Sequence, residues 1–100
     1  MASEIELSKR GRELITAALE ALADPEGAEF IASNYRDALE LLDLIDQRAP
    51  LPGWALGYLD DIARVISSDI RHKLQITRSD LHDLQTLDNI RERIAAAVLG

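Results

Sequence analysis

Apolar residues recur every three or four positions along most of this chain, and short proline-containing segments interrupt the pattern in only two places. This spacing puts apolar side chains on one face of a helix, whereas a half-buried strand needs strict alternation over several residues. The interruptions lie at residues 24–27 and 49–53, and a softer one follows at residues 76–79. We therefore expect an all-α fold: a compact helical bundle of four main helices plus one short helix, in a single domain over residues 1–100.

Capping residues indicate where the first two helices begin. Ser3 and Glu6 fit a capping box, so the first helix is expected to start directly after Ser3. Asp24 can cap the second helix, with Pro25 at its first position, where no backbone amide is needed. The apolar spacing then carries this helix to about Arg48.

The second half of the chain predicts three further helical segments. A long helix is expected over residues 54–73, after the proline-rich turn. Ser79 can cap a short helix that ends near residue 84, and Thr86 can cap the last main helix.

Nothing in the sequence matches a catalytic or cofactor-binding motif. The chain has no cysteine, and its five glycines form no phosphate-binding loop. Asp80, His82 and Asp83 are the only cluster that resembles metal ligands, but Asp80 is better explained as a first-turn acid that faces the positive end of a helix. We expect no enzyme activity, no cofactor, no metal and no catalytic residue.

The charge and the first residues of the chain limit its location and its partners. The net charge is −7, which disfavours direct binding to nucleic acid. The N-terminal residues are charged and lack the apolar stretch of a signal peptide. No apolar run approaches the roughly 20 residues that span a bilayer. The sequence therefore predicts a cytoplasmic protein with no membrane partner.

The negative charge is concentrated in the middle of the chain. Residues 13–61 hold eleven acids but only two bases, Arg36 and Arg48. In the second expected helix, several acids share one side, and two apolar residues off the core stripe lie beside them. The expected partner-binding residues are Glu29, Phe30, Asp37, Glu40, Asp43 and Leu44. Such a surface fits a non-catalytic regulator or inhibitor that docks on a basic protein partner.

In size, acidity and expected helical content, and in its lack of motifs, the chain resembles small phage-encoded inhibitors, including the anti-CRISPR proteins. The resemblance implies a partner that handles nucleic acid, such as a CRISPR–Cas or other nucleoprotein complex. The acids would then imitate a row of phosphates or block the channel that DNA enters.

Two alternatives remain open. One is a structural subunit that self-associates, as a homodimer or assembly component, through Phe30, Leu44 and Trp54. The other is a transcription-regulating helical domain with a cationic edge. That edge would consist of Arg64, Arg71, Lys73 and Arg78.

The stretch of residues 56–62, together with residues 76–77 and 84–87, resembles the second half of an acyl carrier protein. This resemblance covers some 40 residues and implies similar helix packing. The family's serine, which takes the phosphopantetheine arm, aligns with Tyr58, and the aspartate before it aligns with Gly57. Because the acceptor hydroxyl of the family is missing, we do not expect carrier activity.

Overall fold

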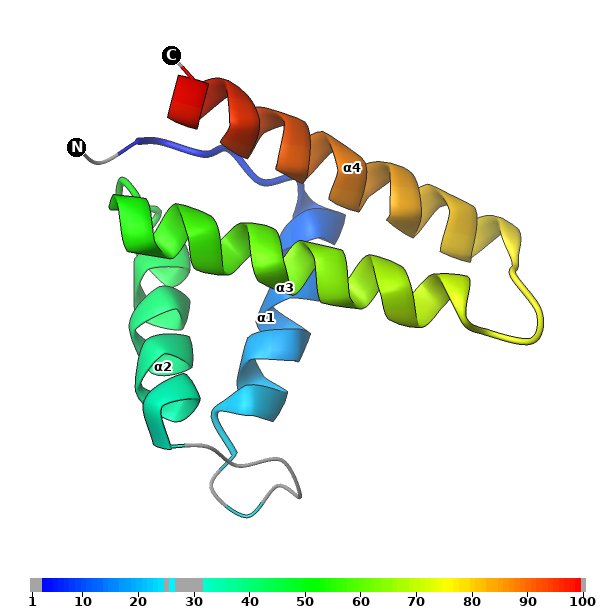
Figure 1. The fold of residues 1–100 in the computed structure, drawn as a ribbon, viewed down its shortest axis with the longest axis horizontal. Helices are drawn as coiled ribbons and strands as arrows, with labels where there is room; N and C mark the ends of the chain where they lie inside the picture. The colour runs from blue at the N-terminus through cyan, green and yellow to red at the C-terminus, as the bar shows by residue number, and fades with distance from the viewer. Residues whose placement is uncertain (1–2, 25, 27–31, 100) are drawn as a thin grey trace.

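The computed structural model of this chain describes residues 3–24, 26 and 32–99. Within them the only β-structure is one isolated bridge, so the expected all-α bundle is confirmed. The helices are α1 Lys9–Leu22, α2 Ala32–Asp46, α3 Gly53–Arg71 and α4 Arg78–Leu99. α3 and α4 form a long antiparallel pair, and α1 and α2 lie side by side across it (Figure 1).

α1 lies at the centre of the bundle and packs against each of the other three helices. Its buried residues, Gly11, Ile15 and Leu19, are four positions apart and therefore share one face. The core encloses large side chains from all four helices completely. These are Ile15, Leu19, Leu41, Leu59 and Leu87. Burying each one contributes about 1.5–3 kcal/mol relative to its exposed state.

The first helix begins later than the capping-box pattern predicted. Ser8 is the N-cap of α1, and its Oγ accepts a hydrogen bond from the amide three residues later at 3.1 Å. Ser3 instead pairs with Leu51 through two backbone hydrogen bonds of 2.8 and 2.7 Å. Between Ser3 and Ser8, Ile5 and Leu7 both pack against the core. In a helix they would point to opposite sides, so the segment is extended.

One continuous helix, α4, replaces the short helix and the last helix that the sequence predicted. Thr77 caps it: Thr77 Oγ1 accepts from the Asp80 amide at 3.1 Å, and Asp80 Oδ2 accepts from the Thr77 amide at 2.9 Å. Thr86, the expected cap, lies inside α4 and donates its hydroxyl to the His82 carbonyl at 3.0 Å. This bond to the preceding turn accommodates a threonine within a helix, so no break is needed there.

α2 ends at Asp46, two residues before the expected end at Arg48. The Arg48 amide donates to the Ile45 carbonyl at 3.1 Å, and the Ala49 amide donates to the Leu44 carbonyl at 2.9 Å. These two bonds make a Schellman motif, whose left-handed residue is usually glycine. Here that residue is Arg48, with φ of 54°. The chain therefore turns sharply after α2 and places an arginine at the turn.

Candidate protein interface

Two of the six expected partner-binding residues, Glu29 and Phe30, lie outside the described residues. The expected start of the second helix at Pro25 lies outside them as well. Asp24, the expected cap, is described: its Oδ1 accepts a hydrogen bond from the Glu26 amide at 2.9 Å.

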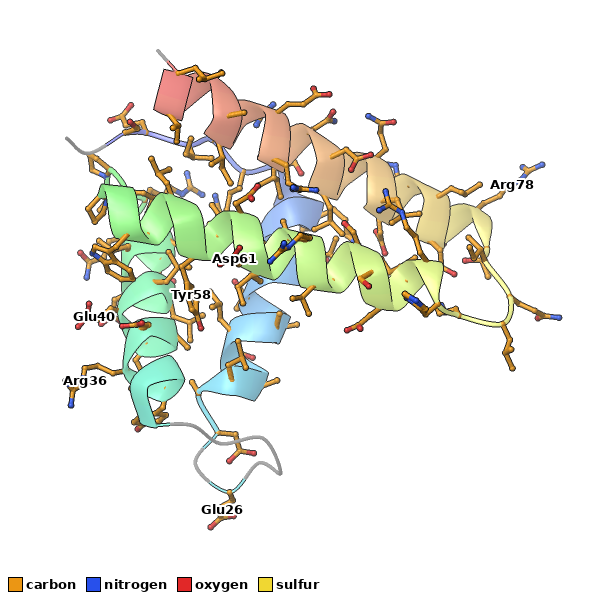
Figure 2. The ribbon with its side chains drawn as sticks, in the orientation of Figure 1. Glu26, Arg36, Glu40, Tyr58, Asp61 and Arg78 are labelled. Atoms are coloured by element: carbon orange, nitrogen blue, oxygen red, sulfur yellow. The ribbon has the colours of Figure 1, made fainter. Side chains whose placement is uncertain are left out.

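The three remaining acids of the prediction lie on α2, but they do not share one environment. Glu40 and Asp43 are exposed, and so is Asp46, which the sequence analysis did not select. Asp37 is partly buried. Arg36 is exposed one turn before Glu40, and both side chains project from the side of α2 that faces away from α1 (Figure 2).

The apolar residue on this side of α2 is Leu39, not Leu44. Leu44 is partly buried and packs against the core, close to the turn at residues 48–51. Leu39 is 40% exposed and lies one helical turn before Asp43. At 100° per residue Leu39 and Leu44 both fall on the flanks of the core stripe, so packing decides which of the two is exposed. We call Leu39, Glu40, Asp43 and Asp46 the acidic face.

Ion pairs in the described part of the chain leave the acidic face uncompensated. All the ion pairs there involve α1, α3, α4 or the loop between α3 and α4. They join Arg10 to Glu13 and Asp83, Arg64 to Asp61, Arg71 to Asp88, Lys73 to Asp80, and Arg91 to Asp60. Among the described residues, Arg64, Arg71, Lys73 and Arg91 pair with acids of α3 and α4, and no base pairs with an acid of α2. The α2 carboxylates remain available to an outside cation.

Asp37 lies close enough to Tyr58 of α3 for its charge to act on the phenol. Burial raises the pKa of the Tyr58 phenol on α3, and the negative charge of Asp37 raises it further. The Tyr58 hydroxyl oxygen is enclosed and has no hydrogen-bond partner among the described residues. Asp37 therefore contributes to the field around this phenol, at the margin of the acidic face.

The cluster that resembles metal ligands is engaged in structural contacts. Asp80 accepts from Thr77 in the α4 cap and from Lys73 Nζ at 2.9 Å, so it is the first-turn acid that the sequence predicted. Asp83 binds Arg10. Across residues 3–24, 26 and 32–99, no group of three or more His, Asp or Glu side chains is arranged to hold a metal ion.

The expected cationic edge is mostly paired within the fold. Arg64 and Lys73 contact acids at 3.3 and 2.9 Å, and Arg71 lies 4.0 Å from Asp88. Arg78 is exposed at the end of the α3–α4 hairpin (Figure 2). Phosphate binding needs several free cations on one surface. The described residues of this edge do not present them.

Trp54, expected to take part in self-association, is 44% exposed at the start of α3. Val98 and Leu99 are exposed at the end of α4, which lies at the same end of the antiparallel pair (Figure 1). Between the two helices lies a shallow groove of about 680 Å³, lined by Gly57, Val98 and neighbouring residues. This end of the molecule therefore carries more exposed apolar side chain than the acidic face does.

Comparison with protein-family models, curated proteins and solved structures finds no match to this chain. No helix within the described residues is long and apolar enough to cross a bilayer.

Proposed function

We propose that this protein is a non-catalytic regulator or inhibitor that docks the acidic face of α2 on a basic surface of a partner that handles nucleic acid. The single observation that carries the proposal is that none of the described acids of α2 has an ion pair within the described fold, whereas each of the other three helices has at least one acid that does. Uncompensated surface charge of one sign steers association with a surface of the opposite sign.

The acidic face has the composition of a small interface. Leu39 supplies an exposed apolar side chain, and Glu40, Asp43 and Asp46 surround it with carboxylates. Arg36 is an exposed base one turn before Glu40. A basic groove that normally holds phosphates would bind these carboxylates in their place, and the bulk of the bundle would then exclude nucleic acid.

Affinity capture with a pair of charge-matched variants tests the proposal. The acidic-face variant is Glu40→Lys with Asp43→Lys. The control is Glu20→Lys with Glu92→Lys, which makes the same charge change at exposed sites on α1 and α4. We expect the wild-type chain and the control to retain the same nucleic-acid-binding protein, and the acidic-face variant to lose it. Added duplex or single-stranded DNA should compete for the same surface.

Two further measurements accompany the capture. Binding to the retained protein should weaken steeply as salt rises from about 0.05 to 0.3 M, because screening removes long-range attraction. Both variants should keep the wild-type Tm, since none of the four acids makes an ion pair in the described fold. Equal capture by both variants, or capture that is indifferent to salt and DNA, would contradict the proposal.

Exposed Trp54 favours a second candidate function, a self-associating structural subunit. In this case the apolar end of the α3–α4 pair, with Trp54, Val98 and Leu99, would be covered by another copy. Sedimentation at increasing concentration separates the two candidates. Self-association that Trp54→Ala abolishes would support the structural role, and a monomer at millimolar concentration would contradict it.

A further inference from the structure

A cavity of about 800 Å³ shares no lining residue with the acidic face, although the end of α2 contributes to both. The extended N-terminal segment, the first turn of α1 and the turn after α2 form its walls. Apolar side chains make much of its lining, including Ile5, Leu44 and Leu51. Leu51 is held there by its backbone pairing with Ser3. The cavity is thus a product of the fold and joins residues 4–12 to residues 44–51, which are distant in sequence.

Three cations also line this cavity: Lys9, Arg12 and Arg48. None of them makes an ion pair in the part of the chain that the structure describes. Arg12 is partly buried, and its Nε is enclosed without an acceptor among the described residues. A buried donor that is left unpaired costs about 1–3 kcal/mol, and more when the group is charged. Arg12 Nε is therefore a donor that lacks its acceptor.

Two acids, Glu4 and Glu6, contribute to the lining as well. Along the extended segment they alternate with Ile5 and Leu7, and they are exposed while the apolar pair is partly buried. The acids therefore lie at the rim, on the solvent side of the segment. They have no ion pair with the cavity's cations among the described residues.

The local sequence concentrates positive charge here against the usual preference. The first turn of a helix favours acids, because its free amides form the positive end of the helix dipole. The first turn of α1 contains no acid and begins with Lys9 and Arg10, and Arg12 follows. Arg10 is compensated by Glu13 and Asp83, whereas Lys9 and Arg12 are not. A bound anion would relieve the repulsion between Lys9, Arg12 and the positive end of the helix dipole.

The third cation is placed by a backbone conformation that favours glycine. Arg48 has φ of 54°, which costs a non-glycine residue roughly 1–2 kcal/mol. Glycine would close the same Schellman turn without this strain but would leave the cavity without its guanidinium. Strain of this kind at a cavity wall is typical of binding sites.

We propose that this cavity binds a small amphiphilic anion, with a carboxylate or phosphate group held by Arg12, Lys9 and Arg48. An aliphatic portion of the same molecule packs against Ile5 and Leu44. A guanidinium recognises both kinds of oxyanion through charge-assisted hydrogen bonds. The site is independent of the acidic face, so either proposal can fail without the other.

Binding to chemically defined probes tests the site. The probes are octanoate, octyl phosphate, inorganic phosphate and octylammonium, each kept below its micellar concentration and measured by calorimetry and by the shift in Tm. We expect octanoate, octyl phosphate or both to bind and raise the Tm, and the one that binds tighter identifies the headgroup. Along a chain-length series, affinity should rise about threefold to fourfold per methylene until the cavity is full.

Variants of the full chain connect binding to the cavity. Arg12→Gln should weaken binding by about tenfold or more, because it removes a charge-assisted hydrogen bond to the anion. Lys9→Gln, at an exposed position where folding is not at risk, should weaken it by a smaller factor. Arg78→Gln removes the same charge at the far end of the α3–α4 hairpin and should leave binding unchanged (Figure 2).

The same measurements can overturn the proposal. Binding of octylammonium as tight as that of octanoate would show hydrophobic adsorption without anion recognition. Inorganic phosphate that binds as tightly as octyl phosphate would remove the amphiphilic part of the proposal. Equal affinities for Lys9→Gln, Arg12→Gln and Arg78→Gln, or no Tm shift with any anion, would exclude this cavity as the site.

Discussion

Arg10 on α1 holds Asp83 on α4 through two hydrogen bonds, from Nε to Oδ1 at 2.8 Å and from Nη2 to Oδ2 at 2.9 Å. The two residues are 73 positions apart in the chain. The Asp83 side chain is only 9% exposed, so its charge needs this partner. The pair therefore joins the first turn of α1 to α4.

Replacing Asp83 by asparagine should destabilise the protein measurably. Asp83→Asn leaves the Arg10 guanidinium with only its exposed contact to Glu13 and turns an amide donor toward another donor. We expect the Tm to fall by about 5–10 °C. Asp61→Asn is the control, because the Asp61–Arg64 pair is exposed on both sides, and exposed pairs contribute little. A Tm of Asp83→Asn equal to that of the control would contradict the role assigned to the Arg10–Asp83 pair.

Stability should decrease in acid for a defined reason. The Thr77 amide and then Lys73 hold the pKa of Asp80 below its ordinary value of 3.8, and Arg10 lowers the pKa of Asp83 from the same value. A carboxyl with a lower pKa in the folded state stabilises the fold above its unfolded pKa, and this contribution is lost as the pH falls through the folded pKa. We therefore expect the free energy of unfolding to fall as the pH drops below about 4.

Urea denaturation across pH 2–7 checks this prediction. The double variant Asp80→Asn with Asp83→Asn should be less stable near neutral pH but should lose less stability on acidification. An acid slope identical to that of the wild type would show that other carboxyls control the acid response.

Gly11 should not tolerate the smallest side chain, although it lies within a helix. A Cβ at Gly11 would lie 3.0 Å from Ile90 Cδ1 and 3.4 Å from Thr86 Cγ2, and both neighbours are buried. At Gly57 in α3, a Cβ meets nothing within 4 Å. Gly57→Ala should therefore raise the free energy of unfolding by about 0.5–1 kcal/mol through helix propensity. Gly11→Ala should lie about 1–2 kcal/mol below Gly57→Ala, and equal values in urea titrations would show that α1 and α4 can separate without cost.

Arg48→Gly should stabilise the fold, unlike most arginine-to-glycine changes. The left-handed backbone at Arg48 is strained for arginine and free of strain for glycine, so we expect a gain of about 0.5–1 kcal/mol. Arg36→Gly, at an exposed site within α2, should instead cost about 1 kcal/mol. A loss of stability in both variants would mean that the Arg48 side chain contributes more to the fold than its backbone strain takes away.

The structure exposes only some of the α2 residues that the sequence placed at the surface. Glu40 and Asp43 are exposed as predicted, whereas Leu44 faces the core and Asp37 faces Tyr58. A helical period locates a core stripe, but the width of that stripe depends on how neighbouring helices cross it. Residues on its flank, such as Leu44, are therefore assigned by packing. The cavity around Arg12 was not predicted at all, because its walls come from residues 4–12 and 44–51, which only the fold brings together.

From the sequence alone, the spacing of apolar residues determined the helical fold class, and composition determined the negative charge of α2. Both are local properties that need no knowledge of neighbours. The tertiary structure decided where α1 begins, because Ile5 and Leu7 reach the core only from an extended segment tied to Leu51. It also decided which acids are paired and which cations are not, since ion pairs join residues as distant as Arg10 and Asp83, which only packing brings together.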